Sequence, residues 1–169
     1  MKTLLIFPPQ WIPYRPYLSL PSLAAYLRQN GIDVEQRDFN IEAFDLMLSK
    51  DYLLGLESRL KAQFIRLENQ DRLQAGIEQS HYNDLFMALA NLQRTTRCID
   101  AAKKTYRGQD YYCPNKLVSA RRTVKEALAI ISTAYFPNRI DFSSFELLDF
   151  RGTFQEIEAL SELDPEPAA

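Results

Sequence analysis

The chain has 169 residues, of which 46% are hydrophobic and 25% charged, and its formal net charge at pH 7 is -2. This length and composition are typical of a soluble globular domain with its own core. The small negative charge argues against nucleic acid, whose phosphates are bound by basic surfaces. No apolar run reaches the roughly 20 residues of a membrane span, and the run after Met1 stops at Pro8, too early for a signal peptide. We therefore expect a cytoplasmic protein that binds neither nucleic acid nor a membrane.

The first forty residues predict a strand, a helix and a second strand. The apolar run LLIF at residues 4–7 is typical of a strand buried on both faces of a parallel sheet. A helix should follow, with Ser19 as its N-cap and Gly31 just past its end. Apolar and polar residues then alternate up to Asp38, as they do in strands. Such a strand, crossover helix and strand form a right-handed βαβ unit with parallel strands.

Ligands of βαβ folds bind beyond the carboxyl ends of the strands. In this chain that region comprises the proline-rich and aromatic loop of residues 8–19 and the residues around Asp38. Asp38 has two interpretations, an acid that contacts a ligand or the N-cap of a helix that starts near Ile41. The first loop lacks the GxGxxG pattern of dinucleotide-binding proteins. We therefore favour the cap.

From residue 41 onward the pattern is helical. Apolar residues recur at spacings of three and four over four segments, residues 41–54, 56–67, 83–106 and 115–135. Ser80 or Asn83 is expected to cap the third of these helices. Residues 139–154 allow a short strand or an extended arm, and Thr153 is expected to cap a last helix. The tail of residues 164–169 should be disordered.

Some polar side chains of the helical region have structural interpretations. Asp45 belongs to an exposed-looking helix face with no apparent pocket for catalysis. Tyr106, Tyr111 and Tyr112 are interpreted as residues that cover helix ends. His81 is the only histidine and is expected in a capping or surface role at a helix start. No metal site is expected, because no second histidine could assist it.

Four sequence features together resemble the start of a known domain. They are the run FPPQW, the run PYLSLPSLAAYLR, the turn at Gly31 and the strand ending in RDFN. They are similar to the start of the cobalamin-binding domain of radical S-adenosylmethionine proteins. That superfamily contains the anaerobic Mg-protoporphyrin IX monomethyl ester oxidative cyclases and related iron-sulfur oxidoreductases. The close resemblance covers about the first quarter of the chain, and the rest resembles the helical insertion of some members.

The resemblance implies a fold class and a domain organisation. Residues 1–40 would be the α/β start, a partial Rossmann-like βαβ unit with parallel strands that begins a cobalamin-binding domain. Residues 41–163 would be a mostly α-helical insertion, followed by the disordered tail. The chain would then be predominantly helical overall.

The resemblance also implies how the chemistry is divided. Cobalamin would be the cofactor of this segment, whereas S-adenosylmethionine and a 4Fe-4S cluster would belong to a downstream radical domain. Cys98 and Cys113 are the only cysteines, too few for the CxxxCxxC motif of that domain, and we expect both to stay reduced. The DxHxxG motif that supplies a cobalt ligand is absent as well. We expect a non-catalytic N-terminal part of a longer enzyme, whose partner is its own downstream domain. The alternative is a helical interaction domain that docks a partner.

The candidate cofactor-binding residues come from the strand ends and the start of the first helix. A corrin ring is large, flat and mostly apolar, so its site needs an apolar platform and a few hydroxyl or backbone donors. The candidates are Pro8, Pro9, Trp11, Tyr17, Leu18, Ser19, Ser22 and Asp38. The alternative for the loop is that it only packs against the sheet or another domain. Because a two-stranded sheet leaves unpaired edges, we also expect a homo-oligomer formed through the sheet edge.

Overall fold

The structure is a computed structural model. It describes residues 2–8, 18–70, 76–142 and 144–147. Most of these residues are helical, and a parallel two-stranded sheet lies at their N-terminal end. The predicted fold class is therefore confirmed. Three predictions lie outside the described residues: the contacts of Pro9, Trp11 and Tyr17, the cap at Thr153 and the tail of residues 164–169.

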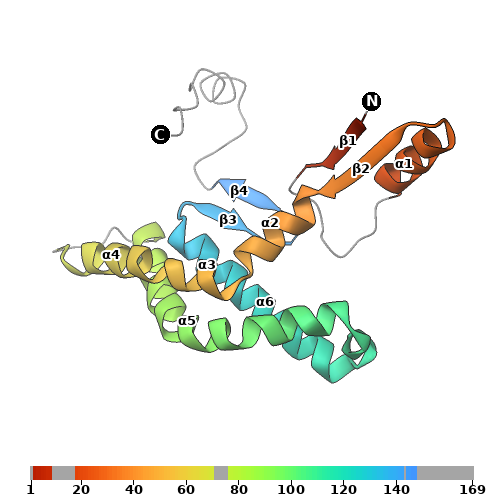
Figure 1. Cartoon of the computed structure of the whole chain (residues 1–169). Helices are drawn as coiled ribbons and strands as arrows, with labels where there is room; N and C mark the ends of the chain where they lie inside the picture. Colours follow the sequence, from red (N-terminus) through yellow and green to blue (C-terminus); the bar gives the residue numbers. More distant parts are fainter. Residues whose placement is uncertain (1, 9–17, 71–75, 143, 148–169) are drawn as a thin grey trace, which may run out of the picture.

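The first three elements form the predicted βαβ unit. They are β1 (Lys2–Phe7), α1 (Ser19–Gln29) and β2 (Asp33–Asp38). The strands pair in parallel, in a register that runs from Lys2 opposite Asp33 to Phe7 opposite Asp38. Gly31, between α1 and β2, has a φ of 75°, which is the left-handed conformation that glycine adopts at low cost after a helix. Figure 1 shows this unit at one end of the helical region, joined to it through α2 (Phe39–Met47).

The prediction that β1 is buried on both faces is wrong. Leu4 and Ile6 are 51% and 45% exposed, whereas Thr3, Leu5 and Phe7 on the other face are half-buried. Helix α1 packs against both strands, and the alternation of exposure along β1 shows that it covers a single face. In the described part of the chain, β1 pairs with β2 alone and no second layer lies over Leu4 and Ile6.

The remaining elements are helices and one short hairpin. After α2 they are α3 (Lys50–Gly55), α4 (Glu57–Glu68), α5 (Ile77–Arg107), the 3-10 helix η1 (Gln109–Tyr112), α6 (Pro114–Ala134), β3 (Asn138–Ile140) and β4 (Phe145–Leu147). β3 and β4 pair antiparallel, so the predicted strand or arm in this region is a hairpin. Helices α5 and α6 run side by side along most of their length, with α3 and α4 packed against them (Figure 1).

Of the helix boundaries predicted from local capping, the one at Asp38 is confirmed and the one at Ser19 is wrong. Asp38 is the N-cap of α2, and its carboxylate accepts a hydrogen bond from the backbone N–H of Ile41 at 3.0 Å, as favoured. Ser19 is not a cap, because α1 starts one residue earlier than expected and Leu18 occupies the N-cap position without a side-chain bond. The single helix predicted over residues 41–54 is broken into α2 and α3, where the hydroxyl of Ser49 accepts from the N–H of Tyr52.

The start of the longest helix also differs from the prediction. Neither Ser80 nor Asn83 caps it, because α5 already begins at Ile77, directly after Gly76. Gly76 has a φ of 99°, a conformation that side chains rarely adopt and that glycine reaches at low cost. The C-terminal end of α5 is as predicted, at Gly108. The earlier start places His81 inside the helix rather than at its first turn.

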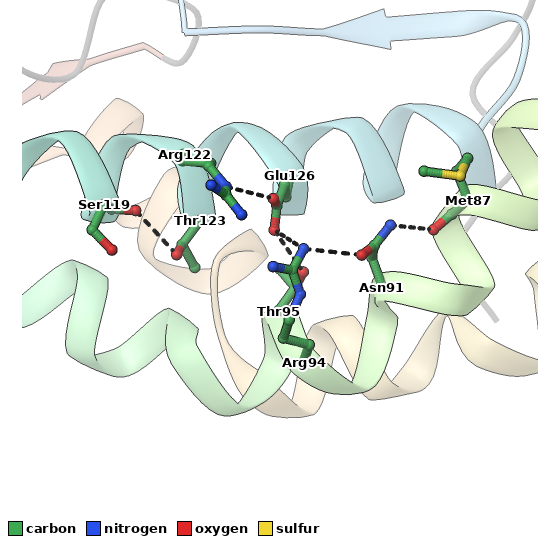
Figure 2. Close-up of polar contacts among 8 residues, drawn as sticks. All are labelled: Met87, Asn91, Arg94, Thr95, Ser119, Arg122, Thr123 and Glu126. Atoms are coloured by element: carbon green, nitrogen blue, oxygen red, sulfur yellow. Dashed lines mark hydrogen bonds and ion pairs between the residues drawn. The ribbon is translucent and has the colours of Figure 1, made fainter.

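The core lies between α5 and α6 and beneath α3 and α4. Its fully buried large side chains are Leu53, Leu60, Leu85, Leu92, Ile99, Val124, Leu128 and Ile131. At the solvent edge of this interface, the carboxylate of Glu126 on α6 joins the two helices. It accepts from Arg94 at 3.0 Å and from Thr95 at 3.4 Å on α5, and from Arg122 on its own helix at 3.3 Å (Figure 2). Packing and this polar network hold α5 and α6 as one hairpin.

Candidate functional site

The carboxyl ends of β1 and β2 lie at the same edge of the sheet. Phe7 and Asp38, the last residues of the two strands, are opposite each other in the register. Pro8 follows Phe7 directly, so the structure brings two predicted site residues, Pro8 and Asp38, to this edge. The N-terminus of α1 lies near the same edge, because a crossover helix runs antiparallel to its strands. The described candidates therefore share one end of the βαβ unit.

The start of α1 presents the other described candidates. Leu18 is 76% exposed, and Ser19 and Ser22 are also exposed. The N–H of Ser22 donates to the carbonyl of Leu18 at 2.9 Å, which is the first helical hydrogen bond. The N–H groups of Ser19 and Leu20 precede this bond, and the first turn of a helix has no carbonyl of its own for them. Pro21 has no N–H to donate. This edge of the unit offers an apolar side chain, two hydroxyls and backbone donors to solvent.

The carboxylate of Asp38 is already engaged by α2, so it acts as a structural cap in this structure. Its neighbour Arg37 forms a second link across the same junction. Arg37 donates to both carboxylate oxygens of Glu42, from Nε at 2.8 Å and from Nη2 at 2.6 Å. This hydrogen-bonded pairing lowers the pKa of Glu42 and raises the pKa of Arg37. The junction between β2 and α2 is thus held in one geometry by two carboxylates.

A cavity of about 740 Å³ lies in the helical region, one helical turn beyond that junction. Its lining comes from α2, the C-terminal end of α5, η1, α6 and Phe142. The lining includes Ile41, Phe44, Asp45, Leu48, Lys103, Tyr106, Arg107, Gly108, Tyr111, Tyr112, Val124 and Phe142. The sequence analysis assigned Asp45 to an exposed face and the three tyrosines to helix ends. The structure instead brings these residues together around one cavity.

Asp45 holds two cations at the wall of this cavity. Lys103 Nζ lies 2.5 Å from the Oδ1 of Asp45 and 3.0 Å from its backbone carbonyl, and Arg107 Nη2 lies 2.7 Å from the same Oδ1. The hydrogen bond from Lys103, with that from Arg107, lowers the pKa of the Asp45 carboxyl. Lys103 and Arg107 are spaced four apart on α5, and this i, i+4 spacing was the one sequence signal that placed both cations on one face. Nothing local in the sequence indicated that Asp45 would face them.

His81 is buried, contrary to the predicted capping or surface role. It is 4% exposed, its ring stacks on Phe136, and its Nε2 lies 3.1 Å from the Oε1 of Gln63. It lines a second cavity, of about 660 Å³, between the start of α5, the end of α6 and β3. Burial lowers the pKa of the imidazole. The physical reason for the error is the early start of α5, which puts residue 81 on the same buried stripe as Leu85, Ala88 and Leu92.

The described part of the chain holds neither a metal cluster nor a membrane-spanning helix. Those residues contain no group of three or more histidine, cysteine or acidic side chains that could hold a metal ion. Within the same residues, no helix has both the length and the apolar character to cross a bilayer. Cys98 and Cys113 are free thiols.

Comparison with known proteins gave no assignment. No family model, curated protein or solved structure matches this chain.

Proposed function

We propose that this chain is the cobalamin-binding N-terminal segment of a radical S-adenosylmethionine enzyme. The observation that supports this most is the parallel pair of β1 and β2, whose carboxyl ends, at Phe7 and Asp38, lie at the same end of the βαβ unit as the start of α1. The segments FPPQW and PYLSLPSLAAYLR resemble that family, and their described residues, Phe7 with Pro8 and Leu18 with the residues of α1, belong to this βαβ unit. In this proposal the segment is cytoplasmic and not itself catalytic. S-adenosylmethionine and the 4Fe-4S cluster belong to a radical domain outside this chain.

The open side of the sheet supports a role within a larger sheet. Parallel strands occur almost entirely in sheets covered on both faces and extended by further strands. Here Leu4 and Ile6 are about half exposed, and β1 has one edge without a partner strand among the described residues. Further strands of the parent enzyme would pair with this edge, and a second layer of helices would bury the two side chains. The downstream domain is thus the first partner that we propose.

The residues at the carboxyl edge have the chemistry that a corrin requires. Pro8 and Leu18 provide apolar contact for the ring. The hydroxyls of Ser19 and Ser22 and the first N–H groups of α1 can donate to the amide side chains of the corrin. Asp38 contributes indirectly, by holding the start of α2 in place at this edge. Pro9, Trp11 and Tyr17 stay part of the proposed site on the basis of the resemblance.

Titration with hydroxocobalamin tests this proposal. We expect saturable changes in its visible absorbance spectrum when the protein is added. The variants Leu18→Ala and Ser22→Ala should weaken binding several-fold each, because they remove an apolar contact and a donor. Tyr26→Ala is the matched control, since Tyr26 is exposed on α1 but lies away from its N-terminus. Equal affinities for all three variants would move the site elsewhere, and absence of saturable binding would contradict the proposal.

The second candidate function is a non-catalytic interaction domain. It is favoured by the exposed Leu4 and Ile6 and by the edge of β1 that no described strand pairs with, because such surfaces mark sites of association. In this case the same surface would bind a partner protein or a second copy of the chain, and cobalamin would not bind. Saturable binding of cobalamin supports the first proposal. Self-association through β1 without cobalamin binding supports the second.

A further inference from the structure

The cavity between α2 and the turn from α5 to α6 combines an apolar floor with an excess of positive charge. We propose that it binds a small amphipathic anion, a molecule with one carboxylate or sulfonate group and an apolar body. This inference is independent of the cobalamin proposal, because the cavity lies in the helical region and shares with the carboxyl edge of the sheet only the helix α2.

The floor of the cavity is formed by side chains of the core. Phe44, Leu48 and Val124 are all buried against the protein while one side of each lines the cavity. The ring of Phe142 lies 6.0 Å from that of Phe44, tilted by 33°, and closes one side. At about 740 Å³ the cavity is within the range of about 300–1,000 Å³ that is usual for small-molecule sites. These surfaces would contact the apolar body.

The charges at the wall favour an anion over a cation. The charged lining residues are Lys103 and Arg107, which are positive, and Asp45, which is negative, so the wall carries one excess positive charge. Asp45 stays ionised, because both cations lower the pKa of its carboxyl. The bond from Arg107 to Asp45 uses Nη2, whereas a guanidinium carries five N–H donors in a fork that matches a carboxylate or sulfonate. Arg107 can therefore bind Asp45 and an incoming anion together.

The mouth of the cavity carries two tyrosines from η1. Tyr111 and Tyr112 meet edge to face, with ring centroids 5.5 Å apart, and both are exposed. Aromatic rings with a polar tip suit a boundary between an apolar cavity and water. Gly108 suits this turn, since a Cβ at that position would lie 3.0 Å from the carbonyl oxygen of Lys104, which is a tight contact. The chain can thus turn sharply from α5 into η1 and place the tyrosines at the opening.

The probe for this site is 1-anilinonaphthalene-8-sulfonate, which joins an aromatic body to one sulfonate and fluoresces when it leaves water. We expect saturable binding to the folded protein. Ile41→Trp should reduce the affinity at least about tenfold, because Ile41 is half exposed in the lining and a larger ring would fill the space. Leu46→Trp is the matched control, since Leu46 lies on the same helix, is exposed and is not part of the lining.

A second pair of variants tests the charge. Arg107→Gln should weaken the probe about tenfold through loss of a charged hydrogen bond. Lys104→Gln removes an equal charge from the exposed surface of α5 outside the lining and should leave the affinity unchanged. Octanoate should displace the probe, and octylamine, with the same chain and the opposite charge, should not. Far-ultraviolet circular dichroism and a thermal melt of each variant show whether the fold is retained.

Three results would overturn the proposal. One is the absence of saturable binding by the folded protein. Another is an affinity that Ile41→Trp and Leu46→Trp change equally, which would place the probe elsewhere, for example on the open face of the sheet. The third is displacement by octylamine as effective as by octanoate, which would show that the charge of the wall plays no part. Cobalamin binding is measured separately by absorbance, so its success or failure leaves these outcomes distinct.

Discussion

The imidazole ring of His81 stacks on the ring of Phe136, with centroids 4.0 Å apart and planes inclined by 20°. This contact joins the second turn of α5 to the residues just after α6. Gln63 on α4 adds a hydrogen-bonding partner for Nε2 at 3.1 Å. Three segments distant in the sequence therefore meet at one buried titratable side chain.

The first prediction concerns the pH dependence of stability at this contact. Burial and the positive charge of Arg66 lower the pKa of His81, and Asp84 partly opposes them. Because the folded protein takes up the proton less readily than the unfolded chain, its stability is highest above the unfolded pKa of about 6.5 and falls as the pH drops below it. We expect the free energy of unfolding in urea to decrease between about pH 7.5 and pH 5.

The variant His81→Leu provides the control for this prediction. It should be less stable than the wild type at pH 7.5, since it loses the partner of Gln63, and should show a shallower decline toward pH 5. Parallel declines in the two proteins would assign the pH dependence to other groups.

A second prediction concerns alkaline pH. The hydroxyls of Tyr52 and Tyr135 lie 3.3 Å apart, and burial followed by this hydrogen bond raises the pKa of Tyr52 to about 12. A raised pKa in the folded state means that stability is complete below the unfolded value of about 10 and is lost as the pH rises through the folded value. When tyrosinate absorbance is followed during an alkaline titration, the wild type should show one tyrosine that ionises at higher pH than an ordinary tyrosine. This step should be missing in Tyr52→Phe. An identical curve would contradict the raised pKa.

The third prediction concerns the C-terminal end of α6. Its last residue, Ala134, has a carbonyl that accepts from Arg59 Nε at 2.7 Å and from Gln63 Nε2 at 2.8 Å. The guanidinium of Arg59 also lies over the ring of Tyr135, 4.4 Å from its centroid. We expect Arg59→Ala to lower the free energy of unfolding by about 1.5–3 kcal/mol, the range for a charged hydrogen bond with its stacking. Lys61→Ala, on an exposed position of the same helix, should change it by less than about 1 kcal/mol.

The fourth prediction compares two adjacent leucines of α3. Leu53 is fully buried, whereas Leu54 is 42% exposed. Leu53→Ala should destabilise the protein by about 2–5 kcal/mol, because it leaves a cavity in the core. Leu54→Ala should cost less than about 1 kcal/mol, since water already covers much of the side chain. Denaturant unfolding of both variants measures this difference, and comparable losses would show that α3 is not packed as described.

The fifth prediction concerns association through the sheet. We expect self-association through the open edge of β1 and the exposed face beside it, so sedimentation at rising protein concentration should show a larger species, and Ile6→Lys should abolish it by placing a charge there. Leu23→Lys, at a similarly exposed position on α1, is the control and should leave association unchanged. A monomeric profile at high concentration would remove self-association from the proposal and leave the downstream domain as the partner of this surface.

The sequence alone determined those elements whose ends are marked by local chemistry. The sequence predicts three helix ends correctly: Gly31 after α1, Asp38 before α2 and Gly108 after α5. Each of these residues acts on its own backbone neighbours, so its effect does not depend on the rest of the fold. The apolar periodicity of α4 and α6 was sufficient to predict both helices. The predominantly helical character and the parallel βαβ start follow from such local patterns.

Tertiary structure decided the properties that depend on which surfaces meet. The second face of β1 is open because no described element covers it, although its run of apolar residues is that of a buried strand. His81 is buried because α5 begins before it and Phe136 lies against it. Asp45 meets a lysine 58 residues later in the chain, and only the tertiary placement of α2 across the cavity from the end of α5 brings them together. Periodicity reports the environment of one segment, whereas the cavity arises from the packing of several distant ones.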